Sequence, residues 1–595
     1  MHNSVIPKWV RLVAILTVMA QAAAFAAFLS GRLQGSARNV LFQVIIGGLG
    51  VLVLLAGYLW RYHATAVPPA PSRLGIVLLI ILAVGLSALY VYRVRPLLRM
   101  PYDLASWSEP MMIVDIIKLR TGESLYLPPD DSNSTVYTPG APAVTYFLAW
   151  LFGRPTSIPF YRLLQQFYLV LAMIFAAGSA RDLVRLAAPE RFRRVPWLWL
   201  IFFALASFLL ATNSPTTAFN VFLHNDAFAL LASTVAFWLL TRHAVTRDSR
   251  WLWAMAVAPA LCFMVKQIAA VWAVAYAVHL WLDGGYSFRR VLVFTLACFG
   301  TVAAALGVCL LVWGEPFRYW AFEPMRSHVV SPLWIARRYA DAAPCILLGL
   351  LGGGVLLGDQ NVRRFFGVWA SWFVMLLAGL YTSGITYHPT HLGAATMVGG
   401  CFALAALAFA WRDSSAPAES PPLQWHRLGL SFLLVFTLFA DLGFTRDQTW
   451  QVSPDLSRYV REIEREFDGL APERVLLDMG DWIYLRHNLV MKDRATILLT
   501  HQTPHFGLIE RIRRQEYAKI LVHFSSNGTD WYDIDRDRGI KKALLTSYRE
   551  VRRIPRVQGV ENWLYRDMLM GDVSVFEPIP RTSTDATPPP GNRQH

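Results

Sequence analysis

Apolar runs of about 20 residues recur along most of this chain and constrain its fold more than any other feature. A helix needs about 20 apolar residues to cross a hydrocarbon core of about 30 Å. Because lipid cannot hydrogen-bond the backbone, a spanning segment has to be a helix or a strand of a closed barrel. These runs are continuous and rich in Leu, Ala and Val, without strict alternation, which favours helices.

The composition also indicates a membrane protein. Of the 595 residues 55% are hydrophobic and 16% are charged, whereas soluble proteins have about 25% charged residues. The sequence therefore predicts a polytopic α-helical membrane protein. Its thirteen candidate spans are about 9–30, 40–60, 74–92, 160–182, 195–213, 218–241, 250–265, 267–283, 289–313, 343–358, 364–383, 390–411 and 427–444.

The formal net charge of +15 does not indicate a nucleic-acid partner. The Arg residues cluster beside apolar runs, where they set orientation and meet anionic lipid headgroups. Arg-rich short connections alternate with Arg-free ones such as NSPTT and SGITYHP. By the positive-inside rule, the N-terminus is expected to be cytoplasmic and the 93–159 segment to face outward. An odd number of spans then places the C-terminal part outside the cytoplasmic membrane.

The chain divides into five predicted parts. N-terminal spans occupy 1–92, an outward loop with juxtamembrane helices 93–159, and a transmembrane core 160–444. After about residue 444, short apolar strands alternate with amphipathic helices, which predicts a small extracytoplasmic α/β domain over 445–580. The tail 581–595 has the composition of a disordered segment.

The outward loop contains the segment SEPMMIVDIIKLRTG, which predicts a short helix. Pro110 suits the first helical position, Glu109 or Ser108 the cap, and Gly122 the stop. Because the segment is heavily apolar, we expect it to lie in the membrane interface.

Three acids in this loop are candidates for chemistry. The helix would hold Glu109 close to Asp103 and about one turn before Asp115. A carboxylate there could take a proton from a hydroxyl that arrives from the aqueous side. The structural alternative is that Glu109 caps the helix and Asp103 is a turn residue.

Further polar residues interrupt the apolar runs. His224, Asn225 and Asp226 lie near the outward end of the sixth span, where an acid has to face a cavity or a partner. Lys266 and Gln267 are flanked by apolar residues in CFMVKQIAAVW, which is either a tight hairpin or a broken helix lining a cavity. A buried ammonium needs an anion, either a phosphate at the interface or Asp226 as a structural counter-ion.

Two other outward connections carry candidate ligands. The 314–342 connection contains Arg326, Arg337 and Arg338, whose planar forks suit phosphate, although such pairs are also common on solvated loops. The ITYHPTHLG loop contains Tyr387, His388 and His391. Two histidines three residues apart can ligate a metal on a helix. Pro389 between them and the absence of a nearby HExxH motif argue against such a site, although a divalent cation is kept as an option.

The order of these motifs resembles the GT-C superfamily of integral-membrane glycosyltransferases, which includes protein mannosyltransferases and the aminoarabinose transferase of lipid A. The resemblance covers about residues 75–445. It depends on a motif series in fixed order: Glu109, then GESLY ending at Tyr126, then Tyr137-Thr-Pro139, then LFG ending at Gly153, then Arg162-Leu.

The resemblance implies an inverting transfer of a sugar from a polyprenyl-phosphate donor at the outer face of the cytoplasmic membrane. The acceptor would be a hydroxyl or amine of a glycan, lipid or protein. It implies a general base at Glu109 or Asp103, with Asp226 in the catalytic set, and a donor phosphate site at Lys266, Arg326, Arg337 and Arg338. The expected pocket contains Asp115, Tyr137, His224, Asn225, Gln267, Tyr387, His388 and His391.

The sequence departs from the family pattern in two respects. Many relatives carry two adjacent acids directly after their first span. Here the acids are spread over Asp103, Glu109 and Asp115, and two extra spans precede the loop.

Two other functions remain as alternatives. A transporter or flippase of a lipid-linked substrate would fit thirteen spans and a basic pocket, but it predicts symmetric halves, and the sequence has no internal repeat. A membrane acyltransferase would use His224 or His388 as its base. No Walker loop or HExxH motif occurs in a fitting context, which argues against ATP-driven transport and zinc proteolysis.

Overall fold

A computed structural model describes residues 73–104, 109–129, 131, 133–187, 197–212, 220–326, 330–356, 362–386, 389–409, 454–478, 480–491, 506–523, 539–555 and 572–580. The chain forms two compact units. The first combines Met1–Arg99 with Val136–Thr449, and the second combines Met100–Thr135 with Trp450–His595.

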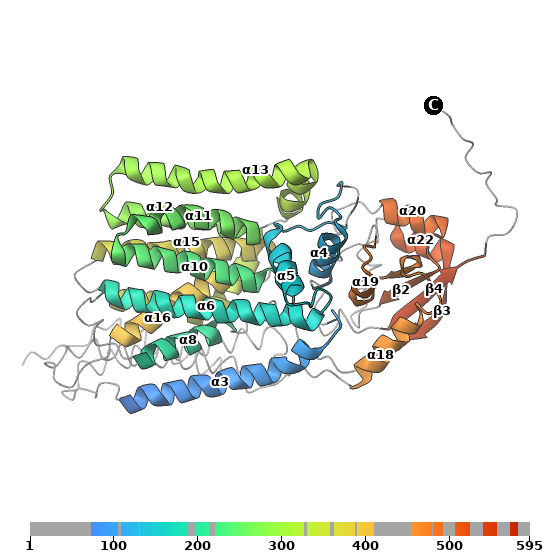
Figure 1. Ribbon diagram of the computed structural model, residues 1–595, viewed down its shortest axis with the longest axis horizontal. Helices are drawn as coiled ribbons and strands as arrows, with labels where there is room; N and C mark the ends of the chain where they lie inside the picture. Colours follow the sequence, from blue (N-terminus) through green and yellow to red (C-terminus); the bar gives the residue numbers. More distant parts are fainter. Residues whose placement is uncertain are drawn as a thin grey trace, which may run out of the picture. The chain divides into compact units, whose positions relative to one another are not determined.

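The first unit is a bundle whose long helices run alongside one another (Figure 1). Its described helices are α3 (Arg73–Arg99), α5 (Gly140–Leu151), α6 (Ile158–Ala187), α8 (Trp197–Ala211), α10 (Asp226–Thr246), α11 (Ser249–Val265), η1 (Gln267–Val271), α12 (Trp272–Asp283), α13 (Phe288–Arg326), α14 (Pro332–Leu356), α15 (Val362–Thr386), η2 (Pro389–Leu392) and α16 (Gly393–Phe409).

Among the described residues, five helices are long and apolar enough to cross a membrane, judged by length and composition. They fall in α6, α10, α13, α15 and α16. The chain is therefore mostly helical and polytopic, as expected. The predicted spans 9–30, 40–60 and 427–444 lie outside the described residues, and the predicted orientation in the membrane stays a prediction.

The CFMVKQIAAVW segment forms a tight hairpin. At one end of the bundle, Asp226 at the start of α10 pairs with Lys266, which precedes η1. At the other end, Arg247 after α10 pairs with Asp283 at the end of α12. Helices α10 and α12 therefore run in the same direction, and α11 between them runs in the opposite one. The chain reverses at Lys266, which agrees with the first of the two options, the tight hairpin.

Two other sequence predictions differ from the structure. Most of the expected 314–342 loop is helical, because α13 continues through a kink at Gly314 (φ 61°, ψ −141°) to Arg326 and α14 begins at Pro332. Polar side chains alone do not end a helix, and Pro316 is tolerated in the first turn after the kink. The span expected from residue 218 becomes α10 only at Asp226, since residues 222–225 form a bend before the helix.

Small residues bring the helices of the bundle into close contact. A Cβ atom built on Gly352 in α14 would lie 2.5 Å from the backbone nitrogen of Ala403 in α16. Glycine at such a crossing lets two backbones approach, which is a common way to pack helices in lipid.

The second unit joins a helix of the polar loop to a mixed sheet. Its described elements are α4 (Glu109–Thr121), α18 (Pro454–Arg465), η4 (Pro472–Arg474), β1 (Val475–Leu477), α19 (Trp482–His487), α20 (Phe506–Arg514), β2 (Lys519–His523), α22 (Ile540–Ser547), β3 (Tyr548–Ile554) and β4 (Val573–Pro578). The strand order is β1-β2-β4-β3. Strand β1 pairs in parallel with β2, and β4 pairs antiparallel with both β2 and β3.

Hydrogen bonds explain why residues 100–135 belong to the same unit as the C-terminal segment. Arg120 at the end of α4 donates to the carbonyl oxygen of Leu485 at 3.2 Å. The Asn133 side chain donates to the carbonyl oxygen of Met491 at 2.5 Å. The segments 93–159 and 445–580 were expected to be separate parts, whereas the structure groups most of the loop with the C-terminal segment.

The glycine contact gives a testable prediction. Gly352→Ala should destabilise the bundle by about 1–3 kcal/mol, because the added methyl group overpacks a backbone contact. Gly354→Ala is the matched control on the same helix, since a Cβ atom there meets nothing within 4 Å. Thermal unfolding of the purified protein in detergent should show a lower melting temperature for the first variant only. Equal melting temperatures would contradict the described crossing of α14 and α16.

Candidate functional site

The candidate site of the first unit is built around a buried ion pair. The Lys266 ammonium donates a hydrogen bond to Asp226 Oδ1, and the two side chains are 8% and 7% exposed. His224 Nδ1 lies 3.1 Å from the other carboxylate oxygen of Asp226. The Asp226 carboxylate thus lies beside two nitrogen groups, the Lys266 ammonium and the His224 imidazole.

Local backbone geometry places these side chains. Lys266 has an extended conformation (φ −158°, ψ 126°) between α11 and η1, so the chain turns at this residue. Asp226 is the first residue of α10, where the helix dipole favours a negative charge. Residues 222–225 before it form a buried bend. Irregular backbone at membrane depth is tolerated where it is buried in protein or lines a cavity.

An aromatic side chain packs against the pair. The Lys266 Nζ atom is 6.0 Å from the centroid of the Tyr137 ring, a distance at which a cation–π attraction still acts. The same ring meets His224 edge to face at 5.5 Å. The neighbouring Thr138 hydroxyl donates to the carbonyl oxygen of Phe263 at 2.7 Å, which fixes this segment against α11.

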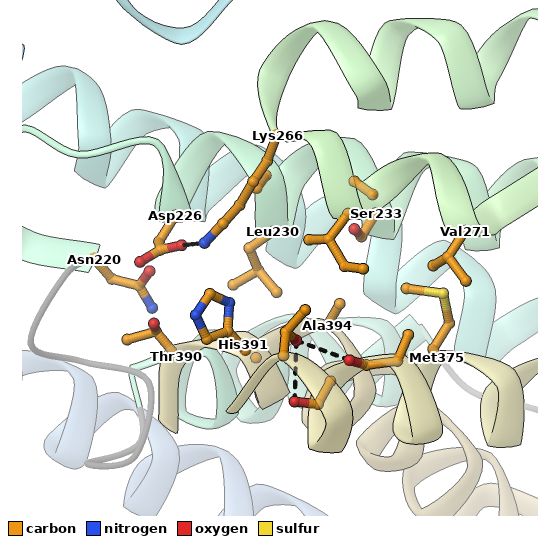
Figure 2. A pocket seen from close by; sticks show the side chains of 17 residues that line it. Asn220, Asp226, Leu230, Ser233, Lys266, Val271, Met375, Thr390, His391 and Ala394 are labelled. Carbon is orange, nitrogen blue, oxygen red and sulfur yellow. Dashed lines mark hydrogen bonds and ion pairs between the residues drawn. The ribbon is translucent and has the colours of Figure 1, made fainter. Parts of the chain in front are cut away.

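A pocket opens beside the ion pair (Figure 2). Its cavity volume is about 50 Å³, within about 560 Å³ of space between atoms that includes open solvent. Its polar end contains Asp226, Lys266 and His391, and the figure shows the His391 ring close to the pair. Its apolar wall includes Leu230 and Met375. The remaining lining residues are Asn220, Ala229, Ser233, Ile268, Ala269, Val271, Ala378, Gly379, Thr382, Thr390, Gly393 and Ala394.

This distribution of charge and apolar surface defines what the pocket can bind. The Lys266 ammonium has its counter-ion in Asp226, and the wall beside it is mostly apolar, with Ser233 and Thr382 among its polar members. A few polar groups at one end of an apolar pocket are the usual arrangement for fixing the orientation of a ligand. The pocket therefore has a charged end and a mostly apolar wall.

The structure brings together Tyr137, His224, Asp226, Lys266 and His391 of the predicted site. Gln267 is a neighbour in sequence, but its amide donates to the carbonyl oxygens of Val136 at 2.7 Å and Ala321 at 3.0 Å, so it holds the fold. Asn225 is fully buried, and its side-chain amide has no hydrogen-bond partner in the part of the chain that the structure describes.

Five predicted residues are not placed at this site. Arg326 ends α13, and Arg337 and Arg338 belong to α14, but only their backbones are described. Tyr387 and His388 lie outside the described residues. Their proposed contacts with a ligand stay predictions.

The predicted acids of the outward loop lie in the second unit. Asp103 is fully buried, and its carboxylate accepts hydrogen bonds from the backbone N–H groups of Asp481 at 2.7 Å and Trp482 at 3.2 Å. These two amides belong to the first turn of α19. Asp103 therefore connects this loop to the start of α19, and its role as a general base stays a prediction.

Glu109 and Asp115 lie on α4, as expected. The helix spans Glu109–Thr121 and ends at Gly122 with φ 76°, in agreement with the predicted stop. The helix residues from Glu109 to Lys118 are all buried. Burial raises the pKa of Asp115 to about 7, opposed by the charge of Lys118 and a hydrogen bond with Thr135.

Lys118 is an important residue that the sequence patterns did not single out. It is fully buried, and its ammonium donates to the carbonyl oxygens of Leu125 and Asn133. It thereby closes the loop that follows α4. Burial lowers the pKa of Lys118, and the nearby charges of Asp115, Asp131 and Glu123 oppose this effect. The three-residue spacing from Asp115 on one helix face was the signal that could have identified it.

Metal binding finds no support in the described residues. No group of three or more His, Cys, Asp or Glu among them is arranged to hold a metal ion. The option of a divalent cation stays open where ligands belong to the undescribed part, which includes His388.

Comparisons with known proteins give a limited result. No family model matches the chain, and no curated protein matches it. Among solved structures, the chain is similar to ArnT from Cupriavidus metallidurans bound to undecaprenyl phosphate, with 13% identity, a TM-score of 0.43 and coverage of 85% of this chain and 98% of that chain. The apo state of the same protein gives 15% identity, a TM-score of 0.43 and coverage of 84% and 97%. At a TM-score below 0.5 this likeness carries no further argument.

The pKa of Asp115 predicts a dependence of stability on pH. A carboxyl whose pKa rises from 3.8 to about 7 on folding binds its proton more tightly in the native state. Stability should therefore fall as the pH rises from about 4 to about 7, by about 1.4 kcal/mol per unit of pKa shift. Asp115→Asn, which resembles the protonated acid, should remove this fall.

Melting temperatures across this pH range provide the measurement. The difference between Asp115→Asn and the wild type should grow in favour of the variant as the pH rises. Asp455→Asn is a matched control, because the Asp455 side chain is 57% exposed. Parallel curves for the wild type and Asp115→Asn would contradict the described burial.

Proposed function

We propose that this chain is an inverting glycosyltransferase that moves a sugar from a polyprenyl-phosphate donor to an acceptor hydroxyl or amine. The reaction would take place at the outer face of the cytoplasmic membrane. The acceptor would belong to a glycan, a lipid or a protein. The C-terminal α/β segment would lie on the same outer side as the active site.

The observation that carries this proposal is the buried ammonium of Lys266 at one end of an apolar pocket. A soluble anion would not need the apolar wall, and a neutral lipid would not need the charge. A polyprenyl phosphate has both parts, a phosphate headgroup and a long apolar chain. Residues of α10, α15 and α16, which are long and apolar enough to cross a membrane, line the pocket.

The proposed reaction breaks the bond between the anomeric carbon and the phosphate oxygen. The acceptor attacks that carbon from the opposite face, so its configuration inverts, and the polyprenyl phosphate leaves with the bonding electrons. The leaving oxygen gains negative charge in the transition state. Lys266 would stabilise it, as fixed cationic groups do in other active sites. Arg326, Arg337 and Arg338 stay proposed partners of the same phosphate.

We assign the general base to Glu109. The resemblance offers Glu109 or Asp103 for this role, and both side chains are fully buried. Glu109 begins α4 at the position that the motif order gives to the catalytic acid. Its carboxylate would accept the proton of the attacking hydroxyl or amine.

Paired variants separate the two acids. Glu109→Gln should lower sugar transfer by about 10²–10⁴-fold without loss of folding, which is the usual contribution of a general base. Asp103→Asn should instead lower the melting temperature. Asparagine has only one carbonyl oxygen, so one of the two buried backbone N–H groups loses its acceptor, at a cost of about 1–3 kcal/mol. Transfer per folded molecule should survive in the second variant.

The measurement is transfer from a panel of undecaprenyl-phosphate sugars in membranes, normalised to folded protein. Glu123→Gln, an exposed acid on the same loop, should behave like the wild type. Wild-type transfer by a Glu109→Ala, Asp103→Ala double variant would disprove the acid–base mechanism. Failure of the wild type with every donor would disprove the proposed function itself for the donors tested.

A further inference from the structure

We propose that Asp226 is the resident anion of the Lys266 site and that a phosphate monoester headgroup replaces it there. This inference rests on the proposed function and assigns Asp226 a positioning role in it. In the ligand-free protein the Asp226 carboxylate forms an ion pair with the Lys266 ammonium. When phosphate binds, Lys266 turns to the phosphate, and Asp226 stays in place as a negative charge beside it.

Charge balance makes the ligand and Asp226 competitors. Lys266 is 8% exposed and lies between apolar helices, so its ammonium needs a counter-ion when no ligand is present. The carboxylate of Asp226 supplies that charge through a direct hydrogen bond. A phosphate that enters the pocket needs the same ammonium, and two anions at one cation repel each other.

The displaced carboxylate has a second partner. A buried carboxylate without any partner would be strongly unfavourable. Asp226 has a second group close by, because His224 Nδ1 lies 3.1 Å from its Oδ2 atom, although the two atoms form no hydrogen bond in the ligand-free protein. A rotation of the imidazole would let His224 donate a hydrogen bond to this oxygen while Lys266 faces the phosphate. The site thus has a position for Asp226 both with and without the ligand.

The pocket gives the ligand access to both members of the pair. Asp226 and Lys266 both line it, and Figure 2 shows the two side chains meeting at its polar end beside His391. The Lys266 side chain starts from extended backbone at a chain reversal. A rotation of its flexible stem is then enough to redirect the ammonium, and no helix has to move.

Competition of this kind favours release of the product. A donor in which phosphate joins the sugar and the lipid carries one negative charge. After transfer the lipid phosphate is a monoester, with about −1.5 to −2 charges at neutral pH, by analogy with phosphorylated side chains. This stronger anion would hold Lys266 tightly if nothing opposed it. The nearby Asp226 carboxylate opposes it and takes the ammonium back as the product leaves.

Binding to the purified full-length chain in nanodiscs tests the inference, with undecaprenyl phosphate and inorganic phosphate as separate probes. Asp226→Asn should bind undecaprenyl phosphate at least about fivefold more tightly than the wild type. Asp226→Glu, which keeps the competing charge, should stay near the wild type. Lys266→Gln should lose most of the binding.

A second variant moves the affinity in the opposite direction. His224→Phe keeps the ring that packs on Tyr137 but removes the second partner of Asp226. The carboxylate should then hold Lys266 more firmly, so binding should weaken several-fold. This variant decides the question if Asp226→Asn fails to fold, which thermal unfolding will show. In the transferase assay, Asp226→Asn should lower KM and slow product release, a split that a purely structural role would not produce.

The outcomes separate the inference from the proposed function. If Asp226→Asn binds equally well or more weakly, or if His224→Phe binds more tightly, the exchange is wrong while the proposed function stands. If only inorganic phosphate shows the expected order of affinities, the exchange stands and the lipid-linked donor is wrong. If the wild type binds neither probe, both are wrong.

Discussion

The ion pair of Lys266 and Asp226 is the interaction on which the candidate site depends. Two opposite charges leave water together and neutralise each other between apolar helices. Removing one partner of such a pair leaves an uncompensated buried charge, at a cost of about 3–5 kcal/mol. The pair exists because the chain reverses after α11, which brings Lys266 to the start of α10. The bundle around it, packed through small residues such as Gly352, keeps these helix ends together.

Among the described residues, two groups of buried charges differ in their partners. In the second unit, Asp103 and Lys118 bind backbone amides and carbonyls, so their charges hold the chain in one conformation. In the first unit, Lys266 and Asp226 bind each other and line a pocket. Side chains can change partners without unfolding backbone. Burial alone therefore does not distinguish the two groups, whereas a side-chain partner together with an open pocket makes Lys266 and Asp226 the candidates for ligand binding.

Local patterns predicted the features that depend on local physics. Hydropathy located most described helices of the first unit, and Pro110 and Gly122 located α4 closely. The predicted connection over 314–342 is mostly helical, because its polar and aromatic residues still form a helix after the kink at Gly314. The pairing of Asp103 with the amides of α19 joins residues far apart in sequence, and no short-range pattern encodes it. For the same reason the sequence offered the pairing of Asp226 with Lys266 only as one of two options.

Binding of a polyprenyl lipid phosphate by Lys266 is the central claim. The most direct measurement is an electron cryo-microscopy structure of the full-length protein in nanodiscs with undecaprenyl phosphate. We expect phosphate density within about 3 Å of Lys266 Nζ, with the prenyl chain along the wall that contains Leu230 and Met375. Lipid phosphate bound elsewhere, with Lys266 and Asp226 still paired and their pocket empty, would contradict the claim.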